Sequence, residues 1–388
     1  MKGSYADVYD SGSDGSERQT GNAVGKGQFP RSEDGMKRYR IGVVAGDGIG
    51  PEVTREARKV LDAVESLGVA GFDIQEYPYG ADHYLETGET LPDQALEEFQ
   101  GQDAVFMGAF GDPRIPDMRH AVDILLGTRF RLDLYVNHRP VKLLDQRLCP
   151  LEGVSGLDYT IFRENTEGLY AGMGGIFKKG TADEVAIQED MNTRKGVERI
   201  IRYAFEFARK RGLERVCMSD KSNALRYGHD LWQRVFEEVG AEYEDIEKQH
   251  FYVDALVMQL VRKPHLFQVI VTCNMFGDIV TDLGAALQGG LGVAASANLH
   301  PGRAAMFEPV HGSAPKYAGK DVANPFAAIL TAQMLLQHVG LTREGGLIGD
   351  AIAGAVQDGK TTRDLGGDLG TAACGDEIVR RVEALSAS

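Results

Sequence analysis

Short apolar runs and longer amphipathic stretches alternate along most of this chain. Residues 39–45, 104–109 and 267–271 are apolar and rich enough in β-branched side chains to form buried strands. Residues 194–211 and 326–339 carry apolar side chains at helical spacing. Strands that alternate with helices predict an α/β fold with mostly parallel sheets flanked by helices.

The length and charge of the chain narrow the class of protein. With 388 residues the chain exceeds what one core usually supports, so we expect two domains. A formal net charge of -15 disfavours nucleic acid and anionic membranes as partners. The four cysteines are scattered without CxxC spacing, which is typical of reduced thiols in a cytoplasmic protein.

The N-terminal segment differs in composition from the rest. Residues 1–37 are rich in Gly, Ser and Asp and lack the apolar core of a signal peptide, so we expect a disordered extension. No apolar run reaches the roughly 18 residues that a membrane span needs.

Two acids follow the apolar run 267–271. Asn274 and Gly277 are expected to end that strand, and Asp278 to begin a helix. Asp278 and Asp282 stand four residues apart, so on a helix they share one face, near its positive end. Such acids can simply complement the helix dipole, but a pair beyond a strand also suits Mg²⁺ or Mn²⁺, which prefer several oxygen ligands.

The glycines of residues 46–50 follow a predicted strand and precede a helix with Pro51 in its first turn. Their spacing is GxGxG and not the GxGxxG of a dinucleotide-binding turn. We therefore expect a tight strand-to-helix turn here and not a phosphate site.

Three arginines stand at the ends of predicted elements: Arg129 on a helix, Arg139 at a strand and Arg163 after a strand. A lone arginine is usually a solvated surface group, but three together could bind a di- or tricarboxylate through their planar forks. The polar, Gly-rich residues 172–192 are either a flexible loop or an arm that pairs with another subunit.

Two further stretches carry candidate chemistry. Lys221 lies at a strand end, where it can serve as a structural ion-pair partner or in catalysis, and Asp254 precedes an apolar helix. Residues 307–320 combine small residues with hydrogen-bond donors, a composition typical of a functional loop.

Six motifs in fixed order carry a resemblance to a known family. They are GDGIGPEV at Gly46, RENTEGLY at Arg163, DKSN at Asp220, YVDA at Tyr252, NMFGDIVTD at Asn274 and EPVHGSAP at Glu308. With them the chain resembles, from residue 40 to its end, the β-decarboxylating dehydrogenases of isopropylmalate, isocitrate, homoisocitrate and tartrate.

The resemblance implies a discontinuous first domain, formed by residues 38–136 and 295–388, that binds the cofactor. Residues 137–294 would form a second domain for substrate and dimerisation, with a dimer-forming arm near residues 172–192. The family also implies a homodimer whose active sites take residues from both subunits.

The functional residues of the family fall on defined positions of this chain. Arg129, Arg139 and Arg163 would bind the malate carboxylates. The metal would be held by Asp278 and Asp282 of one subunit and by Asp254 of the other, which would also lie at the substrate. Tyr170 would protonate the enol, Lys221 would belong to the base system across the interface, and Asn223 would lie near substrate and nicotinamide. The adenosine would be bound by Glu308, His311, Gly312, Ser313, Ala314, Lys316, Tyr317 and Asn324.

The implied reaction is oxidative decarboxylation. A hydride leaves C2 of a 2-hydroxy acid while a base takes the hydroxyl proton, and CO₂ then leaves the β carbon. A divalent cation stabilises the resulting enolate charge, and an acid returns a proton to carbon.

Two positions before Arg129 indicate which substrate to expect. Isocitrate enzymes place a serine and an asparagine six and four residues before this arginine, where the present chain has Asp123 and Leu125. Leu125 and its neighbour Leu126 suit an isopropyl group, and Asp123 would repel a third carboxylate. The resemblance thus favours conversion of 3-isopropylmalate to 4-methyl-2-oxopentanoate, a step of leucine biosynthesis. The leucines could instead simply pack the helix, with isocitrate, homoisocitrate, tartrate or malate as the substrate.

The cofactor signals conflict. Lys316 and Tyr317 stand where NAD-dependent members usually carry an aspartate, which resembles NADP-dependent enzymes. Ala323 before Asn324 is NAD-like, and residues 362–367 lack the tyrosine and arginine that NADP enzymes add. We therefore expect NAD, with NADP as the alternative, together with Mg²⁺ or Mn²⁺.

A catalytically silent allosteric subunit of the same fold is the alternative from another class. Such a chain is expected to lose a metal-binding acid, Tyr170 or Lys221, and this chain retains them all.

Overall fold

The computed structural model describes residues 36–387, so nearly all of the extension predicted for residues 1–37 lies outside the described part. Its strands are β1 (Arg38–Gly46), β2 (Gly71–Tyr77), β3 (Ala104–Ala109), β4 (Val136–Lys142), β5 (Asp158–Glu164), β6 (Gly174–Phe177), β7 (Val185–Gln188), β8 (Arg215–Asp220), β9 (Glu247–Tyr252), β10 (Val269–Thr272), β11 (Ala295–His300) and β12 (Ala304–Pro309). Its helices are α1 (Gly50–Ser66), α2 (Ala81–Thr87), α3 (Asp93–Gly101), α4 (Arg119–Arg131), α5 (Arg194–Arg211), α6 (Gly228–Gly240), α7 (Val253–Arg262), α8 (Asn274–Gln288), α9 (Phe326–His338), α10 (Thr342–Gln357) and α11 (Thr371–Ser386). The predicted alternation of strands and helices is confirmed.

Ten strands form one sheet in the order β2-β1-β3-β12-β11-β4-β5-β10-β8-β9. The strands β2, β1, β3 and β12 run parallel to one another, and so do β5, β10, β8 and β9. Between these blocks β11 and β4 pair antiparallel with each other and with their outer neighbours. The sheet is therefore mostly parallel, as predicted, with an antiparallel seam at its centre.

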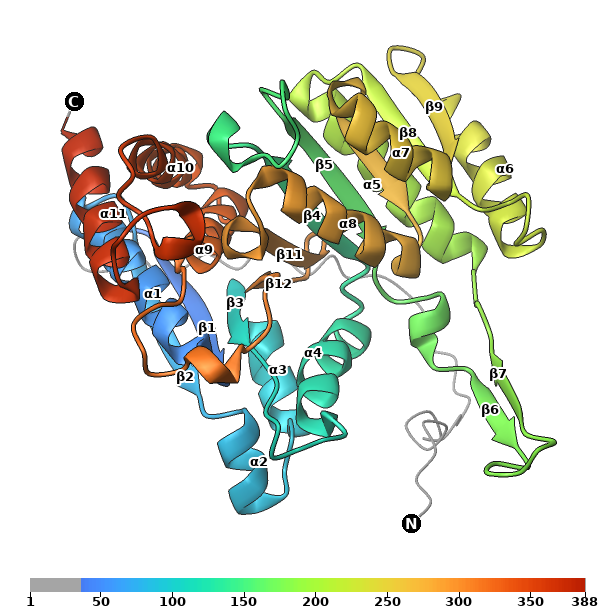
Figure 1. Cartoon of the computed structure of the whole chain (residues 1–388), viewed down its shortest axis with the longest axis horizontal. Coiled ribbons are helices and arrows are strands. Elements are labelled where there is room, and N and C mark those ends of the chain that lie inside the picture. Colours follow the sequence, from blue (N-terminus) through green and yellow to red (C-terminus); the bar gives the residue numbers. More distant parts are fainter. Residues whose placement is uncertain (1–35, 388) are drawn as a thin grey trace, which may run out of the picture.

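The seam separates strands from different parts of the chain. Strands β1 to β3, β11 and β12 lie on one side, and β4, β5 and β8 to β10 lie on the other. These groups follow the chain ranges predicted for the two domains, although the division into domains itself stays a prediction. The chain passes from the first group to the second between α4 and β4, and it returns after α8 (Figure 1).

Three apolar clusters join the helices to the sheet. The largest contains buried side chains of α1, α9, α10 and α11 beside β1, and of α5 and α6 beside β8 and β10. A second lies between α3, α4 and the strands β1 and β3. A third packs α7 and α8 against β4, β5 and β10. Burial of these apolar faces is the main stabilising term of the fold.

The segment predicted to be a loop or an arm is a hairpin. Strands β6 and β7 pair antiparallel and every residue in them is exposed. Figure 1 shows this hairpin projecting away from the rest of the chain. Within residues 36–387 no helix is long and apolar enough to cross a membrane.

One predicted boundary was wrong. Helix α8 begins at Asn274 and not at Asp278. Gly277 lies inside the helix. Glycine is needed at this position because a Cβ would lie only 2.5 Å from Cγ of Arg163. Asp278 and Asp282 consequently face one side of the helix from beyond its first turn, where the helix dipole acts on them less.

Candidate active site

The three predicted arginines converge from three elements near the seam. Arg129 lies in the last turn of α4, Arg139 in β4 and Arg163 near the end of β5, and all three are buried. Burial, with the positive charges of Arg163 and Arg129, lowers the pKa of Arg139 to about 10. Like charges are brought together in this way where an anion is to be bound.

Two carboxylates partly balance the cluster. Glu308 accepts a hydrogen bond of 2.6 Å from Arg129, and Asp278 accepts one of 2.5 Å from Arg163. Asp278 also lies 3.7 Å from Arg139. Three guanidinium groups thus face two acids, which leaves one positive charge uncompensated. The Nε groups of Arg129 and Arg139 are buried and have no hydrogen-bond partner among the described residues.

Asp278 stays ionised in this setting. Burial alone would raise the pKa of its carboxyl group, but Arg163 and Arg139 outweigh burial and hold the pKa below its usual value. Asp282 lies one turn later on α8 and is exposed. The pair offers oxygen ligands of the kind that Mg²⁺ and Mn²⁺ prefer.

Tyr170 joins the cluster from the short helical turn Leu169–Ala171. Its hydroxyl donates a hydrogen bond of 3.0 Å to Asp278, and the guanidinium carbon of Arg163 lies 4.9 Å from the centre of its ring. Burial and the charge of Asp278 raise the pKa of Tyr170. The hydroxyl therefore keeps its proton at neutral pH.

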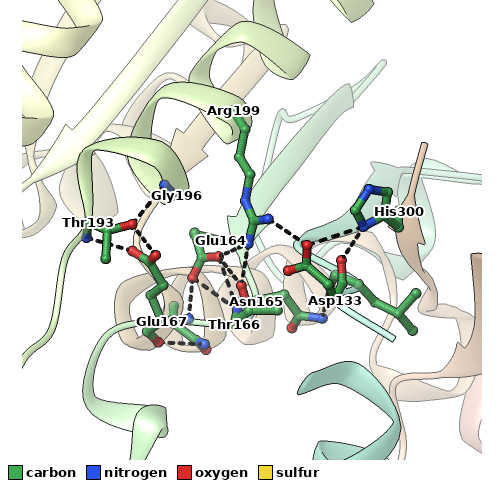
Figure 2. Close-up of polar contacts among 11 residues, drawn as sticks. Asp133, Glu164, Asn165, Thr166, Glu167, Thr193, Gly196, Arg199 and His300 are labelled. Carbon is green, nitrogen blue, oxygen red and sulfur yellow. Dashed lines mark hydrogen bonds and ion pairs between the residues drawn. The ribbon is translucent and has the colours of Figure 1, made fainter. Parts of the chain in front are cut away.

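The segment between Arg163 and Tyr170 is fastened on several sides (Figure 2). The Glu164 carboxylate accepts hydrogen bonds from the backbone N–H groups of Thr166 and Glu167. The Glu167 carboxylate accepts a hydrogen bond from the backbone N–H of Thr193 at the start of α5. Arg199 of α5 donates to Thr166, so the segment is tied to this helix at two points.

Lys221, Asn223 and Asp254 lie elsewhere on the chain. The Lys221 ammonium donates a hydrogen bond of 2.6 Å to Asp254, which lowers the pKa of that acid, and Asn223 is exposed. Within residues 36–387, no three His, Cys, Asp or Glu side chains are grouped so that they could hold a metal ion. Asp254 therefore does not join Asp278 and Asp282 in a single chain.

The predicted adenosine loop rests on the glycine turn. The Ser313 carbonyl accepts a hydrogen bond of 2.8 Å from the backbone N–H of Ile49, and a Cβ at Gly48 would collide with that carbonyl. Lys316 and Tyr317 are exposed, and Gly312 and Ala314 lie on the same loop. The Nε2 of His311 is buried without a hydrogen-bond partner among the described residues. This loop thus combines hydrogen-bond donors with exposed side chains, a combination that is suited to binding a nucleotide.

Two residues predicted for the adenosine loop have other partners. Glu308 is the next-to-last residue of β12, is buried, and accepts hydrogen bonds from Arg129 and, at 2.8 Å, from the amide of Asn298. Asn324 donates a hydrogen bond of 2.9 Å to Asp364.

The glycine turn itself is built around an acid. Asp47 is buried and accepts hydrogen bonds from the backbone N–H groups of Ala81 and Gly111 and from His120. The predicted tight turn from β1 to α1 is confirmed. A buried carboxylate inside the turn also disfavours a phosphate there.

Asn274 was missed as a candidate. It is the first residue of α8, is 2% exposed and contacts Arg163 through its side chain. A polar residue between a buried strand and an apolar helix was the available signal, but we interpreted it as a strand breaker.

Known proteins similar to this chain are dehydrogenases. The family model described as isocitrate/isopropylmalate dehydrogenase matches residues 40–379. A 3-isopropylmalate dehydrogenase of Thermobifida fusca is 46% identical over 350 residues, which cover 89% of this chain and 98% of that protein. A 3-isopropylmalate dehydrogenase of Frankia casuarinae is 45% identical and covers 87% of this chain and 100% of its own length.

Solved structures of similar fold include an isocitrate dehydrogenase from Methylococcus capsulatus. It is 37% identical, with a TM-score of 0.79, and covers 89% of this chain and 99% of its own length. The TT0538 protein from Thermus thermophilus is 36% identical, with a TM-score of 0.80, and covers 91% of this chain and 70% of its own length.

Proposed function

This chain belongs to the isocitrate/isopropylmalate dehydrogenase family of oxidoreductases, and on that premise we propose that it oxidatively decarboxylates 3-isopropylmalate to 4-methyl-2-oxopentanoate. The observation that carries the proposal is the buried cluster of Arg129, Arg139 and Arg163 beside Asp278 and Tyr170. The relatives from Thermobifida fusca and Frankia casuarinae are named for the proposed activity.

The charge of the site supports a substrate with two or more carboxylates. The arginines exceed Glu308 and Asp278 by one positive charge. A divalent cation bound with Asp282 would add one more, and the pair of Lys221 and Asp254 is neutral overall. The oxidised nicotinamide would add a third, so the charge alone accommodates a di- or a tricarboxylate.

The helix before Arg129 supports an apolar substituent on the substrate. Leu125 lies one helical turn before Arg129 and is half-buried, with part of its side chain packed on the cluster beneath α4. Asp123 is exposed and accepts a hydrogen bond of 3.0 Å from Thr90. Leu126 is half-buried beside Leu125. We infer that Leu125 and Leu126 contact the isopropyl group.

A divalent cation and a nicotinamide nucleotide complete the proposed site. We propose that Asp278 and Asp282 hold Mg²⁺ or Mn²⁺ with Asp254 of a second copy, and that residues 311–317 and Asn324 bind NAD. Held there, the cation would supply a Lewis acid and the nucleotide would supply the hydride acceptor.

The protein groups then have separate tasks. The arginines orient both carboxylates, and Tyr170, protonated at neutral pH, delivers a proton to the carbon that CO₂ leaves. Lys221 would take the hydroxyl proton. Its ammonium donates a hydrogen bond to Asp254, which keeps the proposed base beside the proposed metal ligand.

We propose a homodimer with shared sites, because Lys221 and Asp254 are not joined to the arginine cluster in one chain. Exposed apolar side chains on the hairpin, including Ile176, Phe177 and Ile187, offer a surface for a second copy. Met258 of α7 and Ile279 of α8 are also exposed apolar side chains. The four cysteines are free, which supports a reducing, cytoplasmic location.

A substrate panel tests the proposal. Purified protein with Mg²⁺ or Mn²⁺ is given 3-isopropylmalate, isocitrate, homoisocitrate, tartrate or malate with NAD or NADP, and reduced nucleotide is followed by absorbance. We expect the highest kcat/KM with 3-isopropylmalate and NAD. A higher kcat/KM with isocitrate would refute the substrate assignment, and no turnover in any combination would refute the activity.

A further inference from the structure

The side chain of Asn274 joins two segments of the candidate active site. Its amide oxygen accepts hydrogen bonds from Nε of Arg163 at 2.9 Å and from Nη2 of Arg163 at 2.7 Å. Its amide nitrogen donates a hydrogen bond of 3.0 Å to the carbonyl of Glu167. A guanidinium only donates and a carbonyl only accepts, so these partners fix which way the amide points. The amide of Asn274 meets both demands at once.

On one side, Asn274 sets the guanidinium plane of Arg163. Nε and Nη2 of Arg163 both donate to Asn274, while Nη1 donates to Asp278 one helical turn further along α8. The stem of Arg163 lies against Gly277, where a Cβ would be 2.5 Å from Cγ. Arg163 is therefore held to one orientation by the first turns of α8.

On the other side, Asn274 holds the segment that carries Tyr170. The bonded carbonyl of Glu167 directly precedes Gly168, whose φ of +75° turns the chain toward Tyr170. A Cβ at Gly168 would lie 3.4 Å from Cβ of Asn274, so the two backbones are in contact range. Tyr170 in turn bonds to Asp278. The first turns of α8 thus bind this segment at two points, at the Glu167 carbonyl and at the Tyr170 hydroxyl.

The remaining anchors of the segment lie on its far side. Glu167 and Thr166 are tied to α5 through Thr193 and Arg199 (Figure 2). Those contacts fix the segment to the body of the protein but do not touch Arg163. Asp278 joins Arg163 to the Tyr170 hydroxyl, and Asn274 joins Arg163 to the backbone of the segment.

We propose that Asn274 is a positioning residue that sets Arg163 and Tyr170 relative to each other for one substrate. The inference rests on the proposed function, because it assigns Arg163 to carboxylate binding and Tyr170 to proton delivery. Without the Asn274 amide, the Arg163 guanidinium can rotate. The Tyr170 hydroxyl is then no longer held at the correct position relative to the carbon to be protonated. Small misplacements of this kind lower rates strongly.

Three variants separate this role from general destabilisation. Asn274→Ala removes both contacts. Asn274→Asp keeps acceptor oxygens for Arg163 but has no donor for Glu167. Gln268→Ala is the matched control, because Gln268 precedes β10 as Asn274 follows it, and its side-chain oxygen also accepts two hydrogen bonds, from the backbone N–H groups of Glu214 and Arg215.

Kinetics, hydrogen exchange and ligand binding are measured on the same preparations. For Asn274→Ala we expect kcat/KM for 3-isopropylmalate to fall about 100-fold, while KM for NAD changes less than about twofold. Amide hydrogen exchange of residues 166–171 should accelerate in Asn274→Ala and Asn274→Asp, because both lose the bond to Glu167. Gln268→Ala should lower the melting temperature without either effect. The emission of Trp232, the single tryptophan, verifies that each variant is folded.

Several outcomes would overturn the inference. They are unchanged exchange of residues 166–171 in both Asn274 variants, a kcat/KM of Asn274→Ala close to wild type, or an equal kinetic loss in Gln268→Ala. If Asn274→Ala does not fold, Asn274→Asp decides by its exchange rates. Exchange and calorimetric binding of malate need no turnover, so they test the positioning role even if the wild type prefers another substrate.

Discussion

At the scale of single residues, the site depends on charges that are buried together and neutralise one another only in part. Asp278 receives contacts from Arg163, Arg139 and Tyr170, and all three residues lie more than 100 positions away in the sequence. A change at one of these positions therefore alters the protonation and orientation of the others.

Tyr170→Phe tests the assignment of the proton donor. The change removes the hydroxyl that bonds to Asp278 and leaves the ring beneath Arg163. We expect kcat to fall by about 10²- to 10⁴-fold, the usual contribution of a positioned acid, with little change in KM for the substrate. Steady-state kinetics measure this split. A kcat close to wild type would assign proton delivery to another group.

Glu164 gives a prediction for stability against pH. Burial raises the pKa of its carboxyl group from 4.5 to about 7, although Thr166 donates to it. The folded state therefore keeps a proton that the unfolded state releases, so the stabilisation is complete below pH 4.5 and is lost as the pH rises through 7.

Glu164→Gln should remove this dependence. Over that range the free energy of unfolding of the wild type should fall, relative to the variant, by about 3 kcal/mol. Urea denaturation followed by Trp232 emission measures both proteins across the range. Parallel curves for the two proteins would show that Glu164 is ionised throughout.

At the scale of elements, α4 is expected to set the choice of substrate and the turn after β12 the choice of nucleotide. Leu125 is half-buried one turn before Arg129, and Lys316 is exposed with its ammonium 4.7 Å from the centre of the Tyr317 ring. Each can be changed without altering a buried pair.

Leu125→Asn should weaken the contact with the isopropyl group. We expect kcat/KM for 3-isopropylmalate to fall by about 10- to 200-fold, the usual value of an apolar contact in discrimination. Malate lacks the substituent and serves as the control substrate, so its kcat/KM should change little. An equal loss with both substrates would mean that Leu125 only packs α4.

Lys316→Asp should favour NAD further. An aspartate can accept hydrogen bonds from the ribose hydroxyls and repels a 2′-phosphate, so the ratio of kcat/KM for NADP to that for NAD should fall. Lys263→Asp makes the same charge change at an exposed position after α7 and is the control. Equal shifts in both variants would indicate a long-range charge effect only.

The sequence predicted elements better than contacts. The helix at residues 194–211 and the buried strand at residues 104–109 were predicted correctly, because both show in the local periodicity of apolar residues. The start of α8 was wrong because Gly277, a poor helix former, is retained there to accommodate Arg163.

Partners within the site could not be read from local patterns. Arg129 and Glu308 are paired across 179 positions, and Asn137 and Asn298 across 161. Spacing along the chain contains no information about such pairs. The resemblance supplied the arginines and acids but not the amide of Asn274, which acts through Arg163.

At the scale of the whole molecule, the proposed shared site gives a test that needs no structure of the dimer. Lys221→Met and Asp278→Asn should each be inactive alone. In a mixed dimer, one site would receive both mutations and the other neither. After unfolding and refolding of an equal mixture, about a quarter of wild-type activity should return, since half of the dimers are mixed.

Variants refolded separately and then combined at the time of assay are the control and should stay inactive. No recovery in the refolded mixture, with dimers verified by light scattering, would place Lys221 and Asp278 in the same subunit's site.

The packing of the first helix on the last one has a consequence for how the chain is made. Helix α1 lies against α11 (Figure 1), and the Tyr39 hydroxyl bonds to the Val339 carbonyl 300 positions later. At the usual speed of a ribosome, α1 emerges roughly 15 to 60 s before its partner. During that interval residues 137–294 are already synthesised, while the side of α1 that packs against α9 and α11 lacks its native partners and is open to a chaperone.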